Sequence, residues 1–330
     1  MESSFSRAHP SLGLTPKGAS ARWLMVSVAT LLWLFVGTTN TARAGVLCVD
    51  PTGAHRCHRR IADAIAAAWS GETIVVYPGY YNEHSLSIAK DLTLIAEPGR
   101  VTVDGGGHQI FWAIWGYTST LRGFTLVNGH ARSGGALFNK GILTLESLEI
   151  RDSRADYDGG AIYNEGVMTI TGIRLQGNTA RRRGGAIANG RTLVLVGGDF
   201  RDNRALGEGG GFYNESLGWA TFRDVRMTGN QASSGSAVWN DGALGFERAW
   251  FGGNVASDGA TIHNQGALSL VNATLAQNRG TGGVLRNSAT FSLRNVTLAR
   301  NSSGPAIVHL AGSASLRSAL IADNAAAACM

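Results

Sequence analysis

Proline, charge and long apolar runs are all scarce in this sequence. Only 6 of the 330 residues are Pro, and Pro305 alone lies beyond Pro98, so nearly every later backbone N–H can donate within strands. Charged residues make up 16%, against about 25% in typical globular proteins, while 44% are hydrophobic, which excludes a disordered charged tail protein. Glycine, in contrast, is abundant. Its 45 residues are about twice the usual share of roughly 7%, which excludes a mainly helical protein.

The first 44 residues have the pattern of a secretory signal. Basic residues precede an uncharged, largely apolar run over 23–36, and the small residues of a cleavage site follow at 42–44. The run is shorter than the roughly 20 residues that a membrane-spanning helix needs. We therefore predict a signal peptide over 1–44 and one domain over 45–330, which is secreted or held at the cell surface in association with the outer membrane.

Removal of this segment changes the net charge of the chain, and export changes the expected state of its cysteines. It carries half of the formal charge of +6, so the mature chain keeps +3 and no basic stripe with interleaved aromatics, which argues against a nucleic-acid partner. Export also permits disulfides. Cys48 and Cys57 are predicted to pair, which leaves Cys329 without a partner.

A repeat of 22–27 residues is the dominant pattern. Gly-Gly-Ala-Leu-Phe-Asn over 134–139 recurs with small changes over 159–164 and 184–189, and looser copies continue to His309. A second series, in phase with the first, runs from Asn128 to Asn324. Two series in step over eight copies indicate a solenoid. The first series ends on the Asn residues Asn139, Asn164, Asn189, Asn214, Asn240, Asn264 and Asn287.

Each unit contains three short alternating segments, for example 161–163, 167–171 and 173–175, which predict three strands per coil. Strands so short bury a continuous core only when similar coils stack above and below them, as in an all-β parallel β-helix. The residue two places before each Asn is always apolar and predicted to point inward, so the Asn shares its face. Asn side chains stacked about 4.8 Å apart can hydrogen-bond along the axis, and we predict a structural Asn ladder.

The part before the regular repeats of 128–324 is less regular. We predict an Ala-rich helix over 61–69 that plugs the first coil. Strands are expected over 73–77, 92–96 and 101–103, in wider coils of a cap region that spans 45–127.

The repeat motifs carry a resemblance. Gly-Gly-Ala-Ile at 159–162 and 184–187, combined with Phe-x-x-Asn at 200–203 and 251–254, resembles the tetrapeptide repeats of the polymorphic outer membrane proteins. More broadly, residues 57–324 resemble the pectin-lyase-like right-handed β-helix superfamily. The resemblance implies a right-handed, single-stranded β-helix and a surface-exposed passenger that is often adhesive.

One outward column offers candidate catalytic residues. Lyases and hydrolases of this fold work from the outer face of one sheet with Asp, Arg or Lys side chains. The alternating signs of the column favour a solvated ladder of ion pairs between coils over a catalytic site. Its members are Glu149, Arg174, Asp199 and Arg226, with Arg151, Gln176, Arg201 and Thr228 beside them; Asp199, Arg174, Arg201 and Arg226 are the catalytic candidates if the protein is an enzyme.

Two further patterns favour structure over chemistry. Gly-Tyr-Tyr-Asn-Glu over 79–83 resembles the G-x-Y-x-E segment of pectin methylesterases, but their later catalytic segments have no match here. The eight His residues lie nowhere at metal-ligand spacing with Cys, so we predict no metal site and no cofactor.

A second outward column contains aromatic rings above small residues. Such rings either stack to stabilise the sheet or form a platform for sugar rings or a partner protein, and the sequence leaves both open. The candidate binding residues are Phe138, Tyr163, Tyr213, Trp239 and His263.

These patterns predict a non-catalytic adhesive or glycan-binding scaffold, whose partner is a glycan or a surface protein. A lyase or hydrolase of an acidic polysaccharide is the alternative. The linkers between repeats shorten from five residues to two, so no long loop builds a cleft wall, which counts against an enzyme. The final coil should leave Leu320 and Ile321 uncovered, and we predict end-to-end homodimers, with Cys329 as a candidate cross-link.

Overall fold

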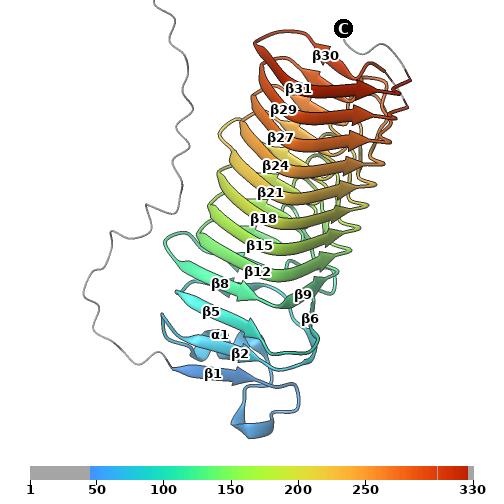
Figure 1. The fold of residues 1–330 in the computed structure, drawn as a ribbon. Coiled ribbons are helices and arrows are strands. Elements are labelled where there is room, and N and C mark those ends of the chain that lie inside the picture. Colours follow the sequence, from blue (N-terminus) through green and yellow to red (C-terminus); the bar gives the residue numbers. More distant parts are fainter. Residues whose placement is uncertain (1–44, 303, 326–330) are drawn as a thin grey trace, which may run out of the picture. The chain divides into compact units, whose positions relative to one another are not determined.

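The computed structural model describes residues 45–302 and 304–325. The predicted signal peptide and Cys329 lie outside these residues. The chain forms a right-handed parallel β-helix, in which the strands of successive coils lie one above the other from the N-terminal to the C-terminal end (Figure 1). Over the described part of the chain, none of the helices has the length and apolar character needed to span a membrane.

Sheet A is the largest of three parallel sheets and contains the long strands labelled in Figure 1. Its regular strands are ten residues long, except for the last, which has nine. Each pairs in register with the equivalent strand of the next coil. These strands are β12 (Ile142–Arg151), β15 (Val167–Gln176), β18 (Thr192–Arg201), β21 (Trp219–Thr228), β24 (Ala243–Gly252), β27 (Ala267–Ala276), β29 (Thr290–Ala299) and β31 (Ala314–Ala322).

Sheets B and C complete the coil with shorter strands. Sheet B consists of β4 (Leu86–Ile88), β7 (Phe111–Ala113), β11 (Leu137–Asn139), β14 (Ile162–Asn164), β17 (Ile187–Asn189), β20 (Phe212–Asn214), β23 (Val238–Asn240), β26 (Ile262–Asn264), β28 (Leu285–Asn287) and β30 (Ile307–His309). Sheet C consists of β10 (His130–Ala131), β13 (Arg154–Ala155), β16 (Thr179–Ala180), β19 (Arg204–Ala205), β22 (Gln231–Ala232) and β25 (Val255–Ala256).

The strand assignment within a coil differs from the one predicted. The segments expected over 167–171 and 173–175 are the two halves of one strand, β15, which bends at Gly172 with a φ of 70°. The third strand of this coil is β16. It is only two residues long, and so short a segment has no alternation by which the sequence could predict it. The bend recurs at the same place in each long strand. A residue with positive φ occupies it at Ser147, Gly172, Gly197, Asp224, Arg248, Asn272, Asn295 and Ser318.

Two ladders of buried Asn side chains hold the coils in register. In the first, the amide of each Asn donates to the side-chain oxygen of the next; Asn164 donates to Asn189 (2.7 Å), which donates to Asn214 (2.8 Å). In the second, both the backbone N–H and the side-chain amide of Asn178 donate to the side-chain oxygen of Asn203 (3.0 Å each). The predicted inward orientation of the first series is confirmed, since all seven of its Asn are fully buried.

The N-terminal coils are built from separate, shorter strands. In these coils, two separate strands take the place of each long sheet A strand. The two rows of short strands meet at β12, which pairs with both β8 and β9. The strands are β1 (Val46–Val49), β2 (Thr73–Val76), β3 (Gly79–Asn82), β5 (Leu92–Ala96), β6 (Val101–Asp104), β8 (Thr118–Arg122) and β9 (Phe124–Val127), and the helices are the 3-10 helix η2 (Ala54–Arg56) and α1 (Ile61–Ala67).

Helix α1 buries Ile61, Ala64 and Ile65 against the first coils, as a plug should. Two side chains from later coils satisfy its ends. The carboxylate of Glu83, which is only 4% exposed, accepts the N–H groups of Ile61 (2.7 Å) and Ala62 (2.9 Å). The ammonium of Lys90 donates to three carbonyls at the C-terminal end of the helix. The contact of Glu83 with the N-terminus of α1 gives the Glu of the 79–83 segment a structural role.

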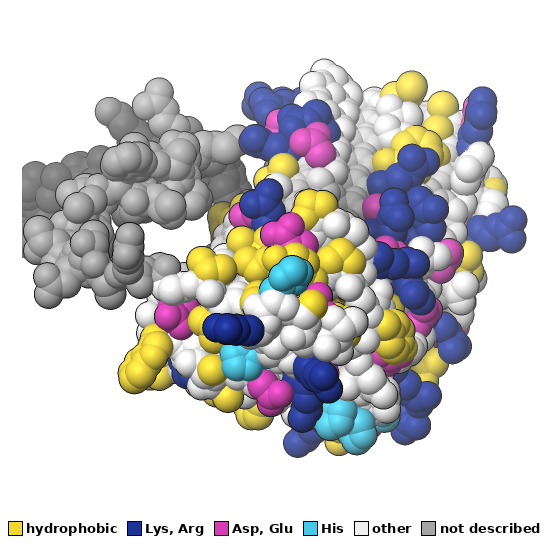
Figure 2. All heavy atoms as spheres, turned by 90° about the horizontal axis from the view of Figure 1, so that it is seen from below, with side chains coloured by type: hydrophobic (Ala, Val, Ile, Leu, Met, Phe, Trp, Pro, Cys, Tyr) yellow, Lys and Arg dark blue, Asp and Glu magenta, His cyan; other side chains and the backbone are white. Residues whose placement is uncertain are grey.

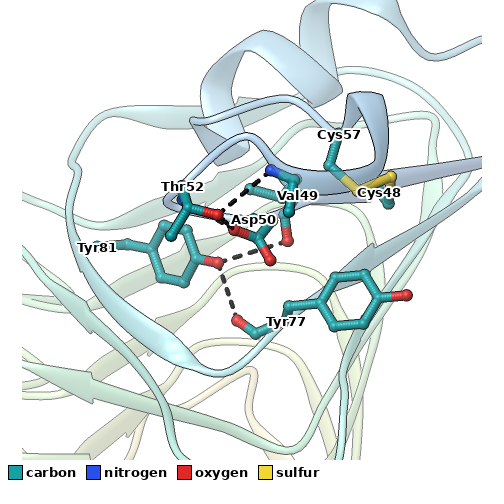
Figure 3. Close-up of a disulfide and its surroundings, with 8 residues drawn as sticks. Cys48, Val49, Asp50, Thr52, Cys57, Tyr77 and Tyr81 are labelled. Atoms are coloured by element: carbon teal, nitrogen blue, oxygen red, sulfur yellow. Dashed lines mark hydrogen bonds between the residues drawn. A yellow bond between two sulfur atoms is a disulfide. The ribbon is translucent and has the colours of Figure 1, made fainter.

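A disulfide closes the loop that leads into this helix. Cys48 and Cys57 are bonded, as expected. The close-up in Figure 3 shows this disulfide together with Tyr81 and the hydrogen bonds of its hydroxyl. Tyr81 is buried and donates its hydroxyl to the carbonyl of Tyr77 (2.8 Å). Seen from this N-terminal end, hydrophobic, charged and His side chains all reach the surface (Figure 2).

At the opposite end of the described chain, β31 pairs with β29. Leu316 and Leu320 are 44% and 58% exposed there, while Ile321 is partly buried against the core. The expected exposure is thus confirmed for Leu320 but only partly for Ile321.

The first Asn ladder should contribute measurably to stability. Replacing Asn189 by Leu removes its bonds to the two neighbouring coils and leaves the amide of Asn164 with only one of its two acceptors, the carbonyl of Thr192, which should cost on the order of 1–3 kcal/mol. Urea unfolding of this variant and of Gln176→Leu, an exposed control, gives the comparison. Equal midpoints would contradict a stabilising ladder.

The capping of α1 is testable in the same way. Glu83→Gln removes the negative charge at the helix N-terminus and weakens two buried hydrogen bonds, for an expected loss of about 1–2 kcal/mol. Glu97→Gln changes a carboxylate that is not at this helix and serves as the control. Hydrogen exchange of the α1 amides should accelerate in the Glu83 variant alone; unchanged protection would refute the cap.

Candidate functional site

One hollow lies on the outer face of sheet A. Its volume is about 560 Å³, and it follows the bend of the long strands over four coils, lined there by Gly123, Ser147, Gly172 and Gly197. A Cβ at Gly172 or Gly197 would meet no atom nearer than 3.7 Å. The hollow therefore exists because the residues at the bend are small and leave its outer side uncovered.

The column of predicted catalytic residues borders this hollow. Strand pairing places its members side by side on successive coils: Glu149, Arg174, Asp199 and Arg226. In the described chain no ion pair joins two of them, so the expected ladder between coils is wrong. Instead, Oδ2 of Asp199 binds Arg201 on its own strand at 2.9 Å, because residues two apart share a face. Oδ1 of Asp199 is buried without a hydrogen-bond partner.

The predicted aromatic column lies on the outer face of sheet B, but it is divided into two groups. The first group is Trp112, Phe138 and Tyr163, and the second is Tyr213, Trp239 and His263. Neighbouring ring centroids are 5.3–6.0 Å apart in the first group, and those of Trp239 and His263 are 3.9 Å apart. Ala188 on β17 separates the groups, since it has no ring to continue the column.

The second group is mostly covered. Tyr213 and His263 are only 5% and 8% exposed, so the expectation of an open platform is wrong for these two. Asp241 accepts hydrogen bonds from the Tyr213 hydroxyl and the Trp239 indole (2.7 Å each). Burial, helped by the charge of Arg286, lowers the pKa of His263 to about 4 and keeps the imidazole neutral at pH 7. These contacts favour a structural role.

The first group, in contrast, lines an open hollow of about 470 Å³. Its rings lie beneath one wall in which Tyr157 is flanked by two guanidinium groups, those of Arg132 (4.6 Å from the ring centroid) and Arg182 (5.3 Å). The other wall is an ion pair of Lys140 with Glu165 (3.5 Å). Other lining residues are Gln109, Ala131, Ser133 and Asp158. This hollow, which we call the sheet B hollow, combines aromatic surface with hydrogen-bond donors and acceptors.

Two partly buried carboxyl groups lie around Tyr163. Oδ1 of Asp158 is buried with no hydrogen-bond partner, and burial raises the pKa of this carboxyl although Arg182 and Arg183 act in the opposite direction. Glu215 reaches back across a coil and accepts the Tyr163 hydroxyl at 3.1 Å, and burial raises its pKa as well. Each carboxyl therefore holds a proton more strongly than an exposed one would.

Glu215 can reach Tyr163 only because the intervening coil carries small residues. A Cβ at Gly190 would come within 3.1 Å of the Glu215 carboxylate. Ala188, on the same coil, is fully buried beneath this layer. Ala188 stands where the column would otherwise have a ring, and its small size leaves room for the hydrogen bond between Tyr163 and Glu215.

Sequence reasoning found Phe138 and Tyr163 but missed the walls of the hollow. Arg132, Tyr157 and Arg182 come from the turns before the Gly-Gly motif, where the residue types change from coil to coil. A usable signal was present at fixed offsets. The residue before Gly-Gly forms an in-register column that includes Asp158 and Arg183, and the residue after the ladder Asn includes Glu165 and Glu215.

Comparison with known proteins extends to the fold and no further. No protein-family model matches the sequence, and a search of curated proteins found no match. Among solved structures, pectate lyase Pel9A aligns with a TM-score of 0.54 and 15% identity, over 83% of this chain and 78% of that one. A rhamnogalacturonan lyase aligns at 0.41 and 11% (79% and 75%), and the Azotobacter vinelandii mannuronan C-5 epimerase AlgE4 A-module at 0.37 and 14% (79% and 89%). The chain has the parallel β-helix fold of pectate lyase Pel9A.

Proposed function

We propose that this protein binds a polysaccharide in the sheet B hollow. The observation that carries the proposal is the combination of Phe138 and Tyr163 with the Arg132–Tyr157–Arg182 wall around one open space. A sugar ring offers an apolar face that packs on aromatic rings and a rim of hydroxyls that need both donors and acceptors. The hollow supplies donors from its Arg and Lys side chains and acceptors from Asp158 and Glu165.

The direction of the first aromatic group suits a polymer. Its three rings come from consecutive coils, which rise by about 4.8 Å each, so a bound chain would lie along the helix axis and contact several rings in turn. The space of about 470 Å³ falls in the range of small-ligand sites, roughly 300–1,000 Å³. The sheet A hollow is less suitable because its lining includes no exposed ring; Phe124, its one aromatic residue, is 1% exposed.

The proposal covers the roles predicted from the sequence. A glycan-binding scaffold and a lyase or hydrolase of an acidic polysaccharide both require that a glycan bind first. Export remains a prediction from residues 1–44, as does the resemblance to the polymorphic outer membrane proteins; the Cys48–Cys57 disulfide suits an oxidising compartment. A surface-protein partner and an end-to-end homodimer remain predictions too, and the exposed Leu316 and Leu320 support the homodimer.

Loss of the tyrosine wall should weaken binding. Tyr157→Ala removes a ring and releases the two guanidinium groups that it holds, so the Kd for a glycan should rise about tenfold, as for other central aromatic contacts. A glycan array with neutral and uronic-acid oligosaccharides identifies the ligand, and calorimetric titration gives the Kd. Trp219→Ala, which removes an exposed ring on sheet A, should leave the Kd unchanged. Equal effects of the two substitutions, or a wild-type protein that binds no glycan, would contradict the proposed function.

A further inference from the structure

We propose that the sheet B hollow hydrolyses the glycosidic bond of the chain that it binds, with Asp158 as the proton donor and Glu165 as the base. The inference rests on the proposed function and deepens it. Both carboxyl groups line the hollow, and both come from the coil that contains Tyr163. Asp158 lies before β14 and Glu165 directly after it, so the two come from opposite ends of one strand.

The environment of Asp158 suits a proton donor. One of its oxygens is shut off from solvent and has no donor to stabilise negative charge. Burial raises the pKa of this carboxyl above its ordinary value, against the charges of Arg182 and Arg183 and a hydrogen bond from the Arg183 backbone. A neutral carboxylic acid beside a bound sugar can protonate the oxygen that leaves when the glycosidic bond breaks.

The environment of Glu165 is the opposite one. Its side chain is 38% exposed and lies 3.5 Å from the ammonium of Lys140. An exposed carboxylate in contact with solvent can take a proton from a water molecule. Glycoside hydrolysis uses a pair of carboxyl groups, one as the acid and one as the base, and the more enclosed Asp158 and the more exposed Glu165 suit these two roles.

The reaction needs only the polysaccharide and water. Water attacks the anomeric carbon and loses a proton to Glu165, while the bond between that carbon and the bridging oxygen breaks. The bridging oxygen takes the proton of Asp158 and leaves as a hydroxyl. The products are two shorter chains, one with a new reducing end, and proton exchange with solvent restores Asp158 and Glu165. No oxidant, reductant or metal enters this balance.

The sheet A hollow is the rival site, since Asp199 also has an unpartnered oxygen. Its other oxygen, however, is already bound to Arg201 at 2.9 Å. The described residues around that hollow also include no exposed ring on which a sugar could be oriented. The geometry therefore favours Asp158.

The test measures cleavage and binding separately. Wild-type protein, Asp158→Asn and Glu165→Gln are incubated with cellohexaose, hexagalacturonate and any hit from the glycan array, and new reducing ends are counted. Each variant should lose at least about 100-fold in the rate of cleavage at a saturating concentration of the glycan, in line with the usual contribution of general acid–base catalysis. The Kd of each variant is measured to set that concentration. Asp156→Asn is the matched control, because Asp156 lies on the same turn but pairs with His130 and Arg181 outside the hollow.

A second substrate separates chemistry from folding. A 4-nitrophenyl glycoside of the bound sugar has a leaving group that needs no proton, so Asp158→Asn should cleave it nearly as fast as wild type while Glu165→Gln should not. Full activity of Asp158→Asn on the hexasaccharide would overturn the assignment, as would a product with the ultraviolet absorbance of an unsaturated sugar, which indicates elimination. A wild-type protein that binds a glycan and releases no reducing ends would refute this inference and leave the proposed function intact.

Discussion

The fixed register between neighbouring coils is the constraint on which the rest of the molecule depends. A β-helix coil has few hydrogen bonds of its own, and its strands are completed only by the coils above and below. The two Asn ladders make a shifted coil unfavourable, since a slip by one residue would bury an outward side chain and leave several amides without acceptors. Every outward column, whether charged or aromatic, inherits its alignment from this register.

Prediction from the sequence succeeded wherever a feature repeats. Inward residues such as Ile162 and Asn164 recur at the same place in each coil, so the orientation of the columns and the parallel β-helix could both be predicted and are confirmed. The two-residue strands of sheet C escaped notice, because a pair of residues has no period. The bend inside β15 was read as a break, since a sequence shows that Gly172 is small but not that strand pairing continues on both sides of it.

The candidate site was predictable only in part, for a related reason. The rings of Phe138 and Tyr163 belong to a repeating column, whereas Tyr157 and its two Arg neighbours lie in turns that differ from coil to coil. The exposure of a ring also depends on what lies beside it. Tyr213 occupies the same column position as Tyr163, yet side chains from adjacent turns, including Arg183 at 5.0 Å from the ring centroid, cover it. The proposed binding site thus depends on side chains that depart from the repeat.

The contact between Glu215 and Tyr163 also limits how the solenoid can vary in length. It joins residues 52 positions apart and spans the coil of Ala188 between them. The ladder spacing is 25 residues across this stretch, from Asn139 to Asn214, and then changes to 26, 24 and 23. A coil can gain or lose a residue near the C-terminal end without any effect on this contact. Between Tyr163 and Glu215, an inserted coil would move the two side chains about 4.8 Å farther apart and break the contact, so the number of coils is limited here as it is not elsewhere.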